Sequence, residues 1–327
     1  MSKKIMAILM VMMMVLGMST MAMAADEDPT ITKTYESLGD GSSPAETFTF
    51  DEWKLFAEDS PLSVEEVEAL GMPSIGEITF IEGAAGNTTD GVKSAGINLP
   101  TYTRVGIYTY TFNEAAGDTA GVTYHSTQMT LKVTVTQGAD GLVTTSAIYA
   151  DGVGEGITKT DNITNTYASG KLTVKKTVSG NAGDLKKPFT FTVVLTVPDK
   201  KVNRSKIGAV LKSQIEGNTL SDPSTDGNTI TYTFALANGD TVAFTNIPAG
   251  VTYSVTEIAE DYTSSFAEGA TSGEITGNAD VNTTINNKKD TTPDTGISLD
   301  NIPYIILLSV AFLGLLFFVT KRRAINE

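Results

Sequence analysis

The sequence contains no cysteine, which excludes disulfide bonds, thiolate metal sites and cysteine nucleophiles. It contains a single histidine, His125, so neither a histidine-based catalytic triad nor a histidine-rich metal site is expected. Only Met72 and Met129 among the methionines lie outside residues 1–24, and the rest of the chain therefore has few oxidisable side chains. This composition suits a protein that works outside the cell.

Basic residues are also scarce, because 23 Lys and Arg stand against 38 Asp and Glu and give a formal net charge of −15. This balance argues against a nucleic-acid partner and against electrostatic docking on an anionic membrane. The sequence has no phosphate-binding loop, no Ser/His/Asp order and no acidic cluster with EF-hand spacing. We therefore expect no metal, no cofactor and no multiple-turnover enzyme.

The two ends have the features of processing signals. Residues 1–24 are typical of a signal peptide, with Lys3 and Lys4 before an apolar run and a small-x-small cleavage site at Ala22–Ala24. Near the other end, an apolar stretch at 302–319 is just long enough to span a bilayer, and a basic tail follows it at 321–323.

The pentapeptide Thr292-Pro293-Asp294-Thr295-Gly296 precedes this apolar stretch. The order of pentapeptide, apolar span and basic tail resembles a sortase sorting signal of the LPxTG type, with Thr292 in place of the usual Leu. The resemblance implies cleavage between Thr295 and Gly296, transfer of the Thr295 carboxyl to an amine, and residues 291–327 as the sorting signal.

The body of the chain has the period-two alternation of half-buried strands, as in Leu131, Val133 and Val135. Turn signals such as Asn238-Gly239 separate many short segments, which predicts an all-β protein built from sandwiches. The exception is 63–70, where Ser63 and Glu66 have the spacing of a capping box. We expect a short helical insertion there, within the first domain.

The body also repeats itself, which predicts two tandem domains at 25–168 and 169–290 with a very short linker at 168–170. Each repeat has an opening Lys strand, a Phe-Thr-Phe segment, a strand that follows Gly, contains Tyr and ends in Glu (106–114 and 250–257), and a closing Asn. The separation from Lys to Glu is 81 residues in both repeats, whereas the separation from Glu to Asn differs. The matching positions are Lys33, Glu114 and Asn165 in the first repeat and Lys176, Glu257 and Asn287 in the second.

Strand alternation places these six polar side chains on the same faces as their apolar neighbours, and therefore toward the two cores. A lone buried charge is costly, so the lysine and glutamate need compensation. A buried salt bridge is one interpretation. The other is chemical: burial lowers a lysine pKa and raises a glutamate pKa, so that a neutral amine attacks the Asn carboxamide while a protonated Glu donates to its oxygen. Loss of ammonia would leave a Lys–Asn isopeptide bond.

The same motifs resemble the isopeptide-containing major pilins of Gram-positive bacteria, in particular the streptococcal T-antigen backbone pilins, over about residues 30 to 296. The resemblance implies Ig-like (Cna-B-type) sandwiches, the bonds Lys33–Asn165 and Lys176–Asn287, and Glu114 and Glu257 as their catalytic acids. Lys175 and Asn286 lie next to two of these positions, and alternation separates them from Lys176 and Asn287 only if no bulge intervenes.

The resemblance also implies a lysine late in the first domain as the acceptor for polymerisation, and Lys159 has that place, with Lys93 as its rival. We expect a pilus backbone subunit on the bacterial surface, anchored in the cell wall. Its partners would be sortase, further copies of itself, minor pilins, peptidoglycan and a host surface. The alternative is a monomeric wall-anchored adhesin, and a wall-anchored hydrolase is disfavoured because no hydrolytic site is evident.

Cleavage at the pentapeptide gives a direct test. Protein released from cell walls should end at Thr295, because sortase transfers that carboxyl group. C-terminal peptide mapping by mass spectrometry measures this, and recovery of mature surface protein that still carries 296–327 would contradict it.

Overall fold

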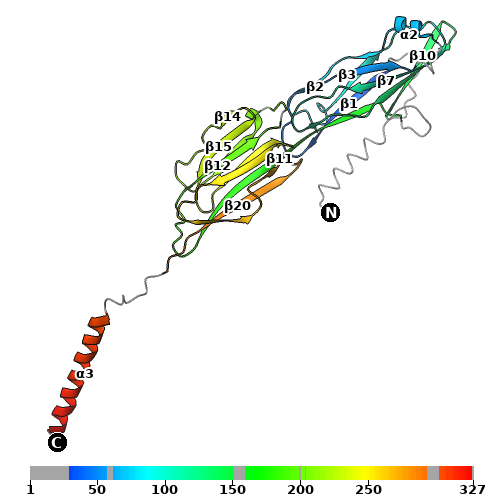
Figure 1. Ribbon diagram of the computed structural model, residues 1–327. Helices are drawn as coiled ribbons and strands as arrows, with labels where there is room; N and C mark the ends of the chain where they lie inside the picture. Colours follow the sequence, from blue (N-terminus) through cyan, green and yellow to red (C-terminus); the bar gives the residue numbers. More distant parts are fainter. Residues whose placement is uncertain are drawn as a thin grey trace.

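The computed structural model describes residues 29–56, 62–150, 159–198, 200–202, 204–292 and 302–325, which form two β-sandwich domains in tandem and a C-terminal helix (Figure 1). The signal-peptide prediction at 1–24, together with Thr295 and Gly296, lies outside these ranges. The mostly-β prediction is confirmed.

The elements follow one another along the chain with short connections. The first part contains β1 (Thr30–Leu38), β2 (Glu46–Phe48), β3 (Phe50–Leu55), α2 (Val64–Leu70), β4 (Ser74–Ile75), β5 (Ile78–Phe80), β6 (Val92–Asn98), β7 (Gly106–Glu114), β8 (Val122–Thr123), β9 (Met129–Gln137) and β10 (Leu142–Ala150). The second part contains β11 (Asn162–Ser179), β12 (Phe189–Thr196), η1 (Arg204–Lys206), β13 (Gly208–Lys212), β14 (Ser224–Asp226), β15 (Thr229–Leu236), β16 (Thr241–Pro248), β17 (Thr252–Glu257), β18 (Thr263–Glu268), β19 (Ser272–Glu274), β20 (Asp280–Lys288) and α3 (Ile302–Ile325).

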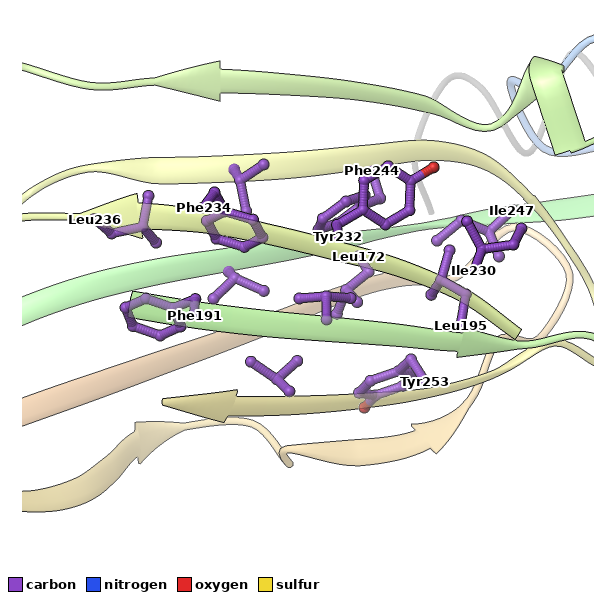
Figure 2. Close-up of a cluster of buried hydrophobic side chains, with 14 of the residues drawn as sticks. Leu172, Phe191, Leu195, Ile230, Tyr232, Phe234, Leu236, Phe244, Ile247 and Tyr253 are labelled. Carbon is purple, nitrogen blue, oxygen red and sulfur yellow. The ribbon is translucent and has the colours of Figure 1, made fainter. Parts of the chain in front are cut away.

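Each domain packs two sheets around its own hydrophobic cluster. In the first domain, the sheet β10-β9-β7-β3 faces strands β1, β6 and the start of β11. In the second, the sheet β14-β15-β12-β17-β19 faces β13, β16, β20 and the end of β11. Figure 2 shows the second cluster, where Phe191 and Leu195 of β12 lie between side chains of the neighbouring strands. These clusters arise because one side of each strand is consistently apolar.

The single strand β11 runs for 18 residues through both domains. It pairs in parallel with β1 in the first domain and with β20 in the second. The sequence predicts a linker at 168–170, but these residues lie inside β11. Every second residue of β11 is buried, and the alternation shifts by one at Ser169 and Gly170, which are both buried. Asn165 and Lys176 are an odd number of residues apart, so this shift is what allows both to point inward.

Gly170 is required at this shift because the chain is crowded there. A Cβ atom at Gly170 would lie 2.8 Å from Ile275 Cγ2 and 2.9 Å from the Ala279 carbonyl oxygen. Polar contacts across the junction add to the packing: Asn246 accepts from the Tyr167 hydroxyl at 3.0 Å and donates to the Ser42 carbonyl at 3.2 Å. The two domains are therefore joined by a continuous strand rather than by a flexible connection.

The two α-helices among the described residues differ in character. Helix α2 begins after Ser63, whose side chain accepts from the Glu66 N–H while the Glu66 carboxylate accepts from the Ser63 N–H, so the expected capping box is present. Helix α3 is long and apolar enough to cross a membrane between Pro303 and Arg322. Neither hydrophobic cluster includes a residue of α3, so both domain cores are complete without it.

Candidate functional site

The six polar residues predicted to point inward form two separate clusters, one in each domain core. We call Lys33, Glu114 and Asn165 the first triad, and Lys176, Glu257 and Asn287 the second triad. The lysine and asparagine side chains of both triads are fully buried, and those of the two glutamates are 0% and 3% exposed. Strand alternation therefore identified the orientation of all six side chains.

In the first triad, the carboxyl group of Glu114 connects the other two members. Lys33 Nζ donates to Glu114 Oε2, and Asn165 Nδ2 donates to Glu114 Oε1. The carboxamide oxygen of Asn165 instead accepts from the main-chain N–H of His125 at 2.9 Å. The expected contact was from the glutamate to the carboxamide oxygen, whereas in the structure the glutamate faces the carboxamide nitrogen. The reason is that the His125 N–H, which can only donate, takes up the oxygen.

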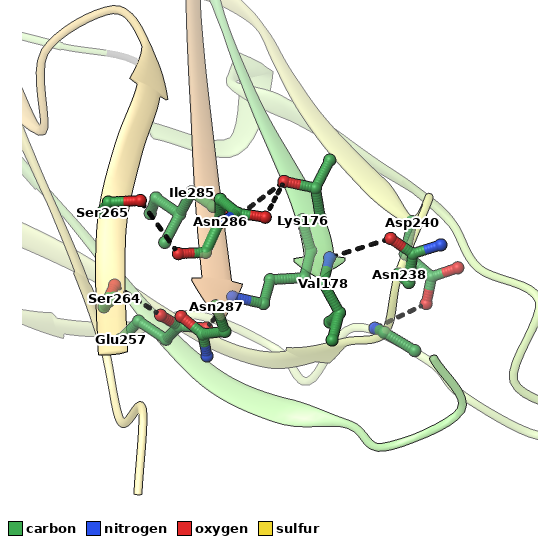
Figure 3. A network of polar contacts seen from close by, with 12 residues as sticks. Lys176, Val178, Asn238, Asp240, Glu257, Ser264, Ser265, Ile285, Asn286 and Asn287 are labelled. Atoms are coloured by element: carbon green, nitrogen blue, oxygen red, sulfur yellow. Dashed lines mark hydrogen bonds and ion pairs between the residues drawn. The ribbon is translucent and has the colours of Figure 1, made fainter. Parts of the chain in front are cut away.

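The second triad has the same members with different contacts (Figure 3). Lys176 Nζ lies 2.6 Å from Glu257 Oε1, and Asn287 Nδ2 donates to this same oxygen at 2.9 Å. The other carboxylate oxygen, Oε2, accepts from the Ser264 hydroxyl at 3.2 Å. Within the part of the chain that the structure describes, Asn287 Oδ1 is buried and has no hydrogen-bond partner. Lys176 Nζ is at ion-pair distance from Glu257, but the contact does not have the geometry of a hydrogen bond.

Strand register places lysine and asparagine in the same relation in both domains. Lys33 lies opposite Ile163 in the parallel pair of β1 and β11, and Asn165 is two residues further along. Lys176 lies opposite Ile285 in the parallel pair of β11 and β20, and Asn287 is again two residues further along. Side chains two residues apart share one face of a strand. The same offset therefore brings an amine and a carboxamide together in each core.

The Phe-Thr-Phe segments that mark the sequence repeat contribute to both triads. The first phenylalanine of each segment lies under the lysine: Lys33 Nζ is 4.5 Å from the centre of the Phe48 ring, and Lys176 Nζ is 4.6 Å from that of Phe189. The second phenylalanine lies opposite the glutamate in the ladder, as the pairs Phe50↔Glu114 and Phe191↔Glu257. The repeated Phe-Thr-Phe segment was visible in the sequence, but its place beside the triads was not.

Burial changes the proton affinity of both lysines. It lowers the pKa of Lys33 to about 8, although the neighbouring Glu114 carboxylate acts in the opposite direction. Burial also lowers the pKa of Lys176, and the contact with Glu257 opposes this shift. Each core therefore favours the neutral, nucleophilic form of its lysine more than water does.

Lys175 and Asn286, which the sequence could not fully separate from Lys176 and Asn287, point away from the second triad. Lys175 is exposed, and the Asn286 side chain is half-buried and bonds to Thr177 and Ser179. Alternation holds across the Lys175–Lys176 and Asn286–Asn287 pairs because the register of β11 against β20 is unbroken from Lys171 to Ser179.

The two lysines considered for polymerisation have different surroundings. Lys159 is exposed, it forms an isolated bridge with Tyr149, and its Nζ lies 6.0 Å from the centre of the Tyr149 ring. Lys93 Nζ donates to the Thr79 carbonyl at 2.6 Å and lies 5.4 Å from the centre of the Phe80 ring. In the described ranges, no group of three or more His, Cys, Asp or Glu side chains could hold a metal ion.

Comparison with known proteins identifies relatives for most of the chain. Residues 29–168 match the family described as the Spy0128-like isopeptide containing domain, and residues 170–289 match a domain of unknown function. A pilin of Streptococcus pyogenes serotype M1 is 29% identical over 264 residues, which cover 76% of this chain and 77% of that protein. The pilus tip adhesin Cpa of Streptococcus pyogenes is 32% identical over 135 residues, which cover 40% of this chain and only 18% of that protein.

Solved structures show the same fold. A major pilin from Streptococcus pyogenes superposes with a TM-score of 0.51 at 24% identity and covers 80% of this chain and 98% of that one. The T3.2 major pilin of the same species gives a TM-score of 0.52 at 22% identity, with coverages of 82% and 100%. Residues 29–168 are thus a Spy0128-like isopeptide domain, and the chain as a whole fits a Gram-positive major pilin, the backbone subunit of a pilus.

Proposed function

We propose that each triad forms an isopeptide bond, from Lys33 to Asn165 in the first domain and from Lys176 to Asn287 in the second. The observation that carries this proposal is the occurrence of two buried triads in which one carboxyl group contacts both the amine and the carboxamide. A plain salt bridge would leave the asparagine without a role. Fixed positions in a dry core supply the main acceleration that such a single-turnover reaction needs.

Glu114 and Glu257 act as the catalytic acids of the two reactions. Each one contacts the amine that must lose a proton and the amide nitrogen that must gain one before it leaves as ammonia. A carboxyl group in that place transfers protons without the need for a water molecule. Both oxygens of Glu114 are used for these contacts, one for each nitrogen.

The two bonds share β11, and this gives them a mechanical consequence. The first bond ties β1 to β11, and the second ties β11 to β20. In a polymer linked through Lys159 and Thr295, tension runs from Lys159 along β11 to Lys176 and then through the second bond to Asn287, so the long loop that the second bond closes is shielded from load. The first bond ties β1 to this loaded strand. By analogy with disulfides, closing a loop of this size stabilises the domain by about 4 to 5 kcal/mol.

The chain works, in this proposal, as the covalently polymerised shaft subunit of a surface pilus. Sortase joins Thr295 of one subunit to Lys159 of the next and finally to peptidoglycan, and minor pilins and a host surface are further partners. Exposure of Lys159 supports this choice over Lys93, whose amine already donates to a carbonyl group. The partial match to a tip adhesin supports the alternative, a monomeric wall-anchored adhesin that binds a host ligand.

Intact mass tests the internal bonds. Recombinant residues 25–290 should weigh less than calculated by two ammonia molecules, and Glu114→Ala and Glu257→Ala should each restore one. Glu260→Ala, which removes a surface ion pair with Lys187, should retain both losses. Asn165→Ala keeps the Lys33–Glu114 pair, so its lower melting temperature reports the loss of the bond together with the two hydrogen bonds of the Asn165 side chain. A wild-type mass equal to the calculated value contradicts the proposal.

Polymerisation is tested on cells. Lys159→Arg keeps the charge but removes the primary amine, so wall extracts should lose the high-molecular-weight ladder on denaturing gels. Lys93→Arg is the matched control and should leave the ladder intact. If the ladder persists in Lys159→Arg and disappears in Lys93→Arg, the acceptor is Lys93. If wild-type extracts contain no ladder, the monomeric adhesin replaces the shaft subunit.

A further inference from the structure

The carboxamide of Asn165 has a fixed orientation, and a main-chain group fixes it. The His125 N–H is 2.9 Å from Asn165 Oδ1. An N–H group can only donate, so the atom that faces it must be the carbonyl oxygen, and the amide nitrogen must then face Glu114. This is the orientation in which the oxygen would hold negative charge during attack by Lys33, with a donor already in place.

Local structure explains how His125 reaches this position. Strand β8 has only two residues, and it pairs with β11 through Thr123↔Thr166 and Val122↔Tyr167. After Thr123 the chain leaves the sheet, and two residues later its backbone N–H meets the side chain of Asn165. A longer β8 would have continued beside β11 and kept this backbone in the ladder.

In the second domain the corresponding neighbour is such a longer strand. Strand β18 remains paired with β20 on both sides of Asn287, from Thr263↔Lys288 to Ser265↔Asn286. In the described part of the chain, Asn287 Oδ1 is buried and accepts no hydrogen bond. Lys176 and the Asn287 amide also share one oxygen of Glu257, while Ser264 bonds to the other. The second triad thus has neither the oxygen donor nor the two-oxygen bridge of the first.

We infer that the main-chain N–H of His125 is an oxyanion donor for the first cross-link, and that the first cross-link therefore forms faster than the second. This inference rests on the proposed isopeptide chemistry. Donors placed where negative charge develops stabilise a transition state more than the ground state, and loss of one costs roughly 100- to 1000-fold in rate.

The reaction starts with the proton of the Lys33–Glu114 pair on Glu114, so that the amine is neutral and the carboxyl group is protonated. The lone pair of the Lys33 amine forms a bond to Asn165 Cγ, and the carbonyl π pair moves onto Oδ1 beside the His125 N–H. Glu114 then gives its proton to Nδ2 and takes one from Nζ. The oxygen pair re-forms the carbonyl, the Cγ–Nδ2 bond breaks, ammonia leaves, and Glu114 is protonated again.

Pulse–chase synthesis of residues 25–290 in a cell-free system measures both rates. Aliquots are quenched in denaturant at intervals and weighed, and Asn287→Ala and Asn165→Ala chains report the first and second site separately. We expect the first site to lose ammonia at least roughly tenfold faster than the second. Equal rates, or a faster second site, would overturn the inference.

An ester at position 125 tests the donor itself. Lactic acid incorporated there removes the N–H, and its reference is His125→Ala, which has the same side chain and keeps the N–H. We expect the ester to slow the first site roughly 100-fold relative to that reference. The matched control places lactic acid at Ser126, with Ser126→Ala as its reference, and should show little change in rate.

The outcomes separate this inference from the proposed function. If neither site of the wild-type chain loses ammonia, the isopeptide proposal itself fails. If both sites react and the ester at 125 matches His125→Ala, the bonds exist but His125 is not the donor. If the ester chain fails to fold, the comparison of the two sites in chains with unmodified backbones still decides the order of the reactions.

Discussion

The structure depends on one costly arrangement that occurs twice: a lysine amine buried in an apolar core, with a carboxyl group and a carboxamide as its polar neighbours. An unpaired charge in such a place would destabilise the fold, and a buried ion pair alone would add little net stability. The third member makes a different outcome available, because an amide bond between lysine and asparagine removes the charge altogether. On this account, the free-energy cost of burying the lysine charge lasts only until the amide bond forms.

Strand β11 turns two local sites into one mechanical unit. It contributes the asparagine of the first triad and the lysine of the second, and both point inward because the alternation shifts at Ser169 and Gly170. Without that shift, residues 165 and 176 would face opposite sides of the strand. The crowding around Gly170 explains why the shift includes a glycine, since any side chain there would meet Ile275 and the Ala279 carbonyl.

The internal repeat and strand alternation together predicted the inward orientation of the six triad residues, because each lies in a strand whose apolar partners mark the inner face. They could not reveal the junction, where a predicted linker proved to be the middle of β11, since nothing in a short Ser-Gly pair distinguishes a turn from a bulge. They also missed His125, which acts through its backbone and leaves no signal in the side chain. The sequence showed Phe48 and Phe189 only as members of a repeated segment, and it did not show that their rings lie beside the two lysines.

The central claim is that the first and last strands of each domain are joined covalently through these triads. The most direct measurement is tandem mass spectrometry of the folded protein after protease digestion. The account predicts branched peptides in which Lys33 is joined to Asn165 and Lys176 to Asn287, each lighter than the two separate peptides by one ammonia. Recovery of the four residues only in separate, unmodified linear peptides would contradict it.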